Sequence, residues 1–216
     1  MAYGIHWEWR GFGAVSAALA LRFATLQEVV YDGQAVEDVY FWAPGLEVNL
    51  KTRAGVEGDL KIKRPLDKDG PLECWREDPG EIFNFPLSDG QWSCLGDVLA
   101  GADLVLGAPP ADAGPAQTTA ALKVAGCTTL GVSKLRQARL WPGRYGPVLI
   151  EWTRIDAPQR LVSIGLETTE AYQRRNEMLA KAGLRAAIEA FGLDQEPLAV
   201  MNYRDAAGQW ANGQLI

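Results

Sequence analysis

Polar and apolar residues alternate along much of this chain, and in several segments the alternating polar residues are cations. Side chains at positions i and i+2 of a strand point to the same face, so this alternation indicates strands with two distinct faces. Turn signals such as Pro44-Gly45 separate the segments. The pattern predicts strands over residues 3–10, 35–42, 46–53, 58–64, 72–76, 128–140, 147–155 and 160–168, with residues 54–57 joining a hairpin.

A helical period replaces the alternation near the end of the chain. Residues 170–191 carry leucine, isoleucine and phenylalanine near helical spacing, and Gly192 can end a helix there. We also expect a short helix over residues 14–25 and a helical or irregular segment over residues 92–101. The Gly-, Ala- and Pro-rich run at residues 107–116 predicts a surface loop.

These elements together predict the fold class. Many short strands joined by hairpins, several with polar residues on one face, are typical of a closed antiparallel barrel. The expected fold is α+β and predominantly β: a closed antiparallel eight-stranded barrel, or tunnel, with a long C-terminal helix and one or two short helices. No repeat at a fixed period divides the chain, so we expect residues 1–216 to form a single domain.

Composition narrows the function classes. With 48% apolar and 22% charged residues, the chain has the composition of a globular protein. A net charge of −6 argues against a nucleic-acid partner. The apolar stretch at residues 13–21 is too short to span a bilayer, so no membrane association is expected. The widely spaced Cys74, Cys94 and Cys127 form no metal motif or disulfide framework, which favours a reducing, cytoplasmic location.

The cations at period two are the first candidate for chemistry. Neighbouring strands that carry cations on one face repel one another unless they surround an anion. Arginine binds phosphate oxygens through two parallel hydrogen bonds, and lysine supplies a point charge. A small triphosphate-like anion would suit such a set, while the alternative is a group of solvated outward faces. The candidate substrate-binding residues are Arg10, Lys51, Arg53, Lys61, Lys63, Lys134 and Arg136.

Three glutamates stand in the same alternating segments. Glu8 shares a face with Arg10, Glu151 interrupts an apolar strand, and Glu167 ends another strand. Carboxylates beside a phosphate site commonly hold Mg²⁺ or Mn²⁺, which neutralises charge and orients an attacking water. The alternative for each glutamate is an ion pair with a cation across the barrel.

The order of these segments carries a family resemblance. Residues 6–10 read His-Trp-Glu-Trp-Arg, and later segments are Asp38-Val39-Tyr40, Leu50-Lys51-Thr52-Arg53, Asp59-Leu60-Lys61, Lys134-Leu135-Arg136, Glu151, residues 161–167, and Asn202-Tyr203 with Trp210. In this order they resemble the motifs of the CYTH superfamily, the triphosphate tunnel metalloenzymes, whose first strand reads Glu-x-Glu-x-Lys. The resemblance implies an eight-stranded antiparallel tunnel that binds a triphosphate through its cations and a metal through its carboxylates.

The chain departs from the family pattern in the acidic half. His6 stands in place of the first glutamate, and Ser163 and Gly165 stand where carboxylates are expected. His6 can join Glu8 and Glu167 as a metal ligand, or it can be a hydrogen-bonded strand residue in a lineage that lost the metal site. Histidine suits Mn²⁺ or Zn²⁺ better than Mg²⁺, so the metal preference would separate these interpretations.

Three functional hypotheses follow. The first is a Mg²⁺- or Mn²⁺-dependent phosphohydrolase of a small triphosphate or inorganic polyphosphate. Its catalytic residues would be Glu8 and Glu151, and its metal ligands would be Glu8, Glu151, Glu167 and His6. The second is a non-catalytic anion-binding protein with an eroded metal site. The third is a barrel for an apolar ligand, with an interior lined by tryptophan. The sequence does not specify an oligomeric state.

Overall fold

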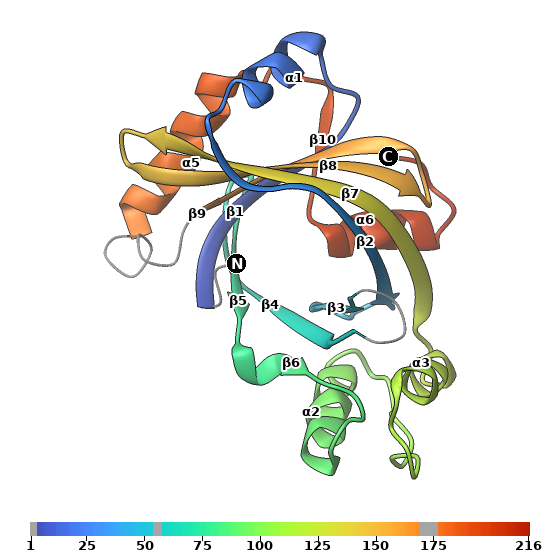
Figure 1. The fold of residues 1–216 in the computed structure, drawn as a ribbon. Helices are drawn as coiled ribbons and strands as arrows, with labels where there is room; N and C mark the ends of the chain where they lie inside the picture. Colours follow the sequence, from blue (N-terminus) through green and yellow to red (C-terminus); the bar gives the residue numbers. More distant parts are fainter. Residues whose placement is uncertain (1–3, 54–57, 169–176) are drawn as a thin grey trace.

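The computed structural model describes residues 4–53, 58–168 and 177–216. In these residues, eight antiparallel strands close into a barrel in the order β1-β5-β4-β3-β2-β7-β8-β9 (Figure 1). The ring closes because β9 pairs with β1, from Glu8 opposite Glu167 to Gly13 opposite Val162. The strands of the ring are β1 (Gly4–Gly13), β2 (Glu28–Trp42), β3 (Asn49–Thr52), β4 (Leu60–Asp69), β5 (Leu72–Glu77), β7 (Thr128–Gly143), β8 (Gly146–Ala157) and β9 (Leu161–Thr168).

Two short strands and five α-helices complete the described part of the chain. β6 (Ile82–Phe83) pairs with β4, and β10 (Leu198–Val200) pairs with β1. The helices are α1 (Ala17–Ala24), α2 (Asp89–Ala100), α3 (Pro115–Val124), α5 (Glu177–Phe191) and α6 (Tyr203–Ala211), with a 3₁₀ helix at Pro79–Glu81. None of the described helices has the length and apolarity needed to cross a bilayer.

Helices cover much of the outside of the barrel, so several strands, β1 among them, are buried on both faces. On β1, Trp7 and Trp9 point outward and are at most 3% exposed, packed with residues of α1 and α5. α2 and α3 cover the outer faces of β3 and β4 at the opposite side (Figure 1). The alternate residues of β1, such as Glu8 and Arg10, are left to face the barrel interior.

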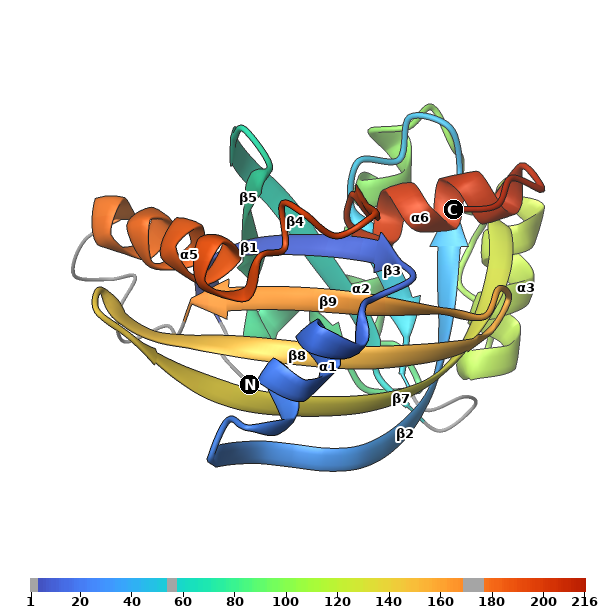
Figure 2. The same ribbon diagram turned by 90° about the horizontal axis from the view of Figure 1, so that it is seen from above.

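α6 closes one end of the interior. Figure 2 shows this helix lying beside the ends of β1 and β2. Its Tyr203 packs edge-on against Phe12, at 5.1 Å between ring centroids, and stacks on Tyr40 at 5.5 Å. Trp210 makes a second edge contact with Phe12. These aromatic contacts form an apolar floor beneath the polar part of the barrel.

The structure confirms the closed eight-stranded barrel and shifts several bounds. β2 begins at Glu28, seven residues before the predicted start, and β7 runs on to Gly143. α5 is followed by Gly192 with φ of +66°, the left-handed conformation expected at its end. The predicted strand start at residue 3, the hairpin turn at 54–57 and the first residues of the predicted 170–191 helix lie outside the described residues.

The prediction of one or two short helices was too low. The described chain has α1, α2, α3 and α6 besides α5, and α5 is not the last element. α3 begins at Pro115, inside the segment predicted as a loop, and the preceding Ala113 is 4% exposed. α6 buries mainly Ala206, Ala207 and Gly208 beside its aromatics, so it has no broad apolar stripe to identify it.

Candidate functional site

The barrel interior holds a cavity of about 140 Å³ lined largely by charged side chains. Within the part of the chain that the structure describes, seven cations line it: Arg10, Lys51, Arg53, Lys61, Lys63, Lys134 and Arg136. The structure therefore brings together every cation that the alternation singled out, and the alternative of solvated outward faces is wrong. Their role in binding a substrate stays a prediction.

Four carboxylates line the same cavity: Glu8, Glu77, Glu151 and Glu167. Val30, Tyr31, Tyr40, Asn49, Leu149 and Tyr203 complete the described lining. No tryptophan is among these described residues, which argues against the apolar-ligand hypothesis. The cavity is polar, and its cations outnumber its carboxylates.

Two lysines face each other directly across neighbouring strands. Lys51 of β3 is the register partner of Lys61 of β4. Like charges in this position destabilise a sheet, so each lysine needs its own counter-charge. Lys51 donates to Asp38 at 2.8 Å, and Lys61 donates to Glu77. Neither Asp38 nor Glu77 was predicted as a site residue.

Asp38 is shared by two lysines. Its Oδ2 lies 2.8 Å from Nζ of Lys51 and 2.6 Å from Nζ of Lys134, and the residue is 1% exposed. Burial opposes ionisation, but the two ammonium groups hold the pKa of Asp38 well below its usual value. Burial lowers the pKa of Lys51 to about 7 and also lowers that of Lys134, although Asp38 partly offsets both shifts. With both lysines protonated, one positive charge is left uncompensated.

Glu77 joins the lysines of β4. Its carboxylate lies 3.6 Å from Nζ of Lys63 and also pairs with Lys61. Burial opposes ionisation of Glu77, but Lys63 and Lys61 hold its pKa at about 2. Burial lowers the pKa of Lys61 to about 8, although the negative charge of Glu77 partly offsets this shift.

Glu151 lies among hydrogen-bond donors. Its Oε1 accepts from Arg10 and from the Thr153 hydroxyl, each at 3.1 Å. Its Oε2 accepts from the Tyr31 hydroxyl at 2.6 Å and from both Nε, at 2.8 Å, and Nη2 of Arg136. Burial opposes ionisation, but Arg136 and Arg10 hold the pKa of Glu151 well below its usual value. Glu151 thereby orients two cavity arginines.

Arg10 connects the acidic strands. It is 7% exposed, and its Nη1 donates to the Ser163 hydroxyl at 3.1 Å. Its Nη2 lies 3.6 Å from Glu167, and its guanidinium lies over the ring of Tyr203 at 4.9 Å. Burial tends to lower the pKa of Arg10, but the charges around it, above all that of Glu151, raise it above its usual value. Ser163, which stands where a carboxylate is expected, here accepts from the arginine.

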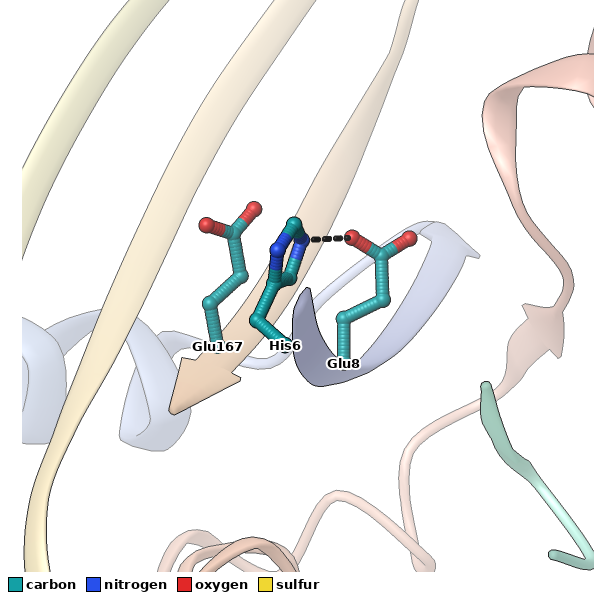
Figure 3. Close-up of side chains that lie close together, drawn as sticks. All are labelled: His6, Glu8 and Glu167. Atoms are coloured by element: carbon teal, nitrogen blue, oxygen red, sulfur yellow. Dashed lines mark ion pairs between the residues drawn. The ribbon is translucent and has the colours of Figure 1, made fainter. Parts of the chain in front are cut away.

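His6, Glu8 and Glu167 form a compact group of possible metal ligands. One ligand atom from each lies within 4.8 Å of the others. Glu8 and Glu167 are register partners on β1 and β9, and His6 is two residues along β1 on the same face. Figure 3 shows the imidazole between the two carboxylates. The structure therefore brings together three of the four predicted ligands, and Glu151 lies apart from this group among its arginines.

The donor set fits a divalent cation. His6 is 1% exposed, and neither of its ring nitrogens has a hydrogen-bond partner among the described residues. The Oε2 atom of Glu8 lies 3.6 Å from Nε2 of His6. A buried imidazole that makes no hydrogen bond among the described residues and lies between two carboxylates is an arrangement that a bound cation would satisfy.

The site residues that sequence reasoning missed are Asp38, Glu77, Tyr31 and Tyr203. Glu77 could have been found, because it continues the inward face of β5 by one step of the alternation. Asp38 and Tyr203 were noted only as parts of family motifs. No sequence pattern marks Tyr31 as facing the interior, because register shifts interrupt the alternation of β2 between Val29 and Gln34.

No protein-family model matches this chain, and no curated protein matches it by sequence. Among solved structures, a conserved hypothetical protein from Pyrococcus furiosus is 15% identical, covers 86% of this chain and 90% of its own, and has a TM-score of 0.48. The PH1012 protein of Pyrococcus horikoshii is 16% identical over 86% and 90%, with a TM-score of 0.46. A protein of Bacillus halodurans described as a candidate adenylate cyclase is 14% identical over 88% and 91%, with a TM-score of 0.44. These similarities carry no inference about activity.

Proposed function

We propose that this protein binds a small triphosphate or inorganic polyphosphate in the barrel cavity and hydrolyses it with the help of a divalent cation, Mg²⁺ or Mn²⁺. The observation that carries the proposal is the lining of the cavity. Seven cations and four carboxylates of the described chain line one cavity, so that cavity favours a multiply charged anion. The resemblance of the strand motifs to the triphosphate tunnel enzymes supports the same assignment.

The cations differ in how free they are to bind a phosphate. Arg53 has no ion-pair partner among the described residues, so its guanidinium is available for two parallel hydrogen bonds to phosphate oxygens. Lys51 and Lys134 share one carboxylate and therefore retain a net positive charge toward the cavity. Because Lys51 and Arg53 lie at the end of β3 and Lys134 lies on β7, they can contact different phosphates of one chain-like anion.

His6, Glu8 and Glu167 would hold the cation. When bound, the cation would neutralise phosphate charge and help to orient a water. Glu151 would keep Arg10 and Arg136 aimed at the anion. Phosphoryl transfer depends mainly on such positioning and electrostatic stabilisation, so fixed cations on several strands suit it. A direct catalytic or metal-binding role for Glu151 stays a prediction.

Tripolyphosphate is the probe that tests this proposal. We expect it to bind by calorimetry and to release phosphate in the presence of Mg²⁺ or Mn²⁺. Arg53→Ala should weaken binding by about tenfold, the loss of a charge-assisted contact. Arg154→Ala is the matched control, because Arg154 is exposed and pairs with Asp156. Glu8→Gln should abolish phosphate release. Absence of tripolyphosphate binding, or tight binding with no phosphate release under any divalent metal, would overturn the proposal.

A second candidate function is anion binding without hydrolysis. The observation that favours it is that every described carboxylate lining the cavity already contacts a lysine or arginine. This function predicts salt-sensitive binding of tripolyphosphate that is unchanged by chelators and gives no phosphate release with any divalent metal. Turnover with Mg²⁺ or Mn²⁺ that disappears in Glu8→Gln would exclude it.

A further inference from the structure

The group formed by His6, Glu8 and Glu167 has a mixed donor set. His6 contributes a ring nitrogen, and the two glutamates contribute carboxylate oxygens. The imidazole is buried and makes no hydrogen bond among the described residues, and its Nε2 lies 3.6 Å from Glu8, itself a candidate ligand. The chemistry of the donors therefore bears on which metal the site takes.

We propose that this site selects a late first-row transition metal ion, such as Zn²⁺ or Co²⁺, over Mg²⁺. Mg²⁺ prefers oxygen ligands and gives up its water reluctantly, whereas imidazole is a good ligand for Zn²⁺ and Co²⁺. One imidazole nitrogen in place of a third carboxylate therefore shifts the metal preference of the site from Mg²⁺ toward Zn²⁺ and Co²⁺. The inference rests on the proposed function and changes the cation expected in it, since it concerns the metal ion bound at the same cavity.

The position of the site leaves room for further ligands. Glu8 and Glu167 line the cavity, and the imidazole of His6 lies between them on β1. Three protein ligands with an open side toward a cavity are typical of zinc sites that also bind water or substrate. The register of β1 against β9 sets the two carboxylates opposite each other, so the arrangement does not depend on a loop.

Two cations compete with a metal for these carboxylates. Lys63 donates to Glu8 at 2.5 Å, and Arg10 lies 3.6 Å from Glu167. Nζ of Lys63 also lies 3.6 Å from Glu77, which offers a second partner when a metal occupies the site. Removing the lysine charge should therefore strengthen metal binding, a result that a purely structural Lys63–Glu8 pair would not produce.

The single histidine of the chain makes the test direct. The untagged 216-residue chain contains one imidazole, so its proton resonances report on His6 alone. We expect Zn²⁺ to shift and Co²⁺ to displace or broaden these resonances, and Zn²⁺ to bind at least about tenfold tighter than Mg²⁺ by calorimetry. Lys63→Gln should raise the Zn²⁺ affinity.

Substitutions at His6 separate selectivity from general metal binding. His6→Gln should weaken Zn²⁺ binding by about tenfold or more, and His6→Glu should move the preference toward Mg²⁺. Glu167→Gln serves if the buried His6 variants do not fold, since its side chain is 24% exposed, and it too should weaken Zn²⁺ binding. Glu28→Gln, at an exposed glutamate, is the control.

The outcomes distinguish this inference from the proposed function. Mg²⁺ binding as tight as Zn²⁺ binding, or Zn²⁺ binding that leaves the imidazole resonances unmoved, overturns the inference. If tripolyphosphate binds but Zn²⁺ shows no preference over Mg²⁺ at His6, the anion site stands while the metal inference falls. Selective Zn²⁺ binding at His6 without any tripolyphosphate binding would support the metal site and overturn the proposed function.

Discussion

A Cβ atom on Gly165 would lie 2.6 Å from Nη2 of Arg10 and 2.8 Å from the central carbon of its guanidinium. Gly165 of β9 is the register partner of Arg10 on β1 and of Glu151 on β8. The guanidinium therefore crosses β9 over the glycine to reach Glu151. The missing side chain is part of an arginine site, because a Cβ there would force the guanidinium away from the position in which it bonds to Glu151 and Ser163.

Substitution of Gly165 should be costly for this reason. Gly165→Ala is expected to destabilise the protein by about 1–3 kcal/mol in urea unfolding, the usual cost of overpacking. In the Arg10→Lys background the cost should be smaller, because lysine has no planar group over the glycine. Gly131→Ala, at a β7 position with open space around the Cβ, is the control. Equal costs in both backgrounds would contradict the interpretation.

Glu151 should contribute to stability through the two arginines it holds. Glu151→Gln leaves Arg10 and Arg136 without their buried counter-charge, so we expect a loss of about 3 kcal/mol. Chemical denaturation measures it, and Glu28→Gln at an exposed position should change stability little. A loss of less than about 1 kcal/mol would show that the arginines find other partners.

Anion binding should weaken as pH rises through neutrality. Burial lowers the pKa of Lys51 to about 7 and that of Lys61 to about 8, so both lose their charge in this range. An anion that binds only protonated Lys51 loses up to about tenfold in affinity per pH unit above pH 7. Calorimetry with tripolyphosphate between pH 6 and pH 9 measures the slope. Lys51→Arg should flatten it, and an unchanged slope would show that only the ligand titrates.

The lowered pKa of Lys51 also predicts how the stability of the anion-free protein changes with pH. Between about pH 7 and 10.5 the unfolded chain retains the Lys51 proton and the folded chain does not. The unfolded state then binds more protons, so this residue makes stability rise with pH in that window. Denaturant titrations of the wild type and of Lys51→Met should differ in this slope. A parallel pH dependence in the two proteins would contradict the prediction.

Tyr203 should hold the cations at the closed end of the cavity. Nζ of Lys134 lies 4.4 Å from its ring centroid, and the guanidinium of Arg10 lies 4.9 Å away. Tyr203→Leu keeps an apolar side chain but removes these contacts, so a loss of about 1–2 kcal/mol and weaker tripolyphosphate binding are expected. Tyr145→Leu removes a comparable contact with Arg144 in the turn between β7 and β8 and should leave anion binding unchanged.

The sequence alone was sufficient to predict the barrel and to assign each cation to one face of its strand. Alternation is a local property, because the geometry of the extended backbone sends residues i and i+2 to the same side. Lys51 and Arg53, or Lys134 and Arg136, could therefore be assigned to one face without knowledge of the partner strands. His6, Glu8 and Glu167 could be grouped only through the family resemblance, and the β1–β9 register then brought them together.

Only the tertiary structure decided which charges pair. Arg10 and Glu151 are 141 residues apart, and no local pattern shows that one crosses Gly165 to reach the other. The sequence predicted a metal ligand at Glu151, whereas the fold surrounds that carboxylate with two arginines, Tyr31 and Thr153. Partner choice inside a barrel depends on strand register and on the space left by neighbouring side chains, and both arise only when the ring has closed.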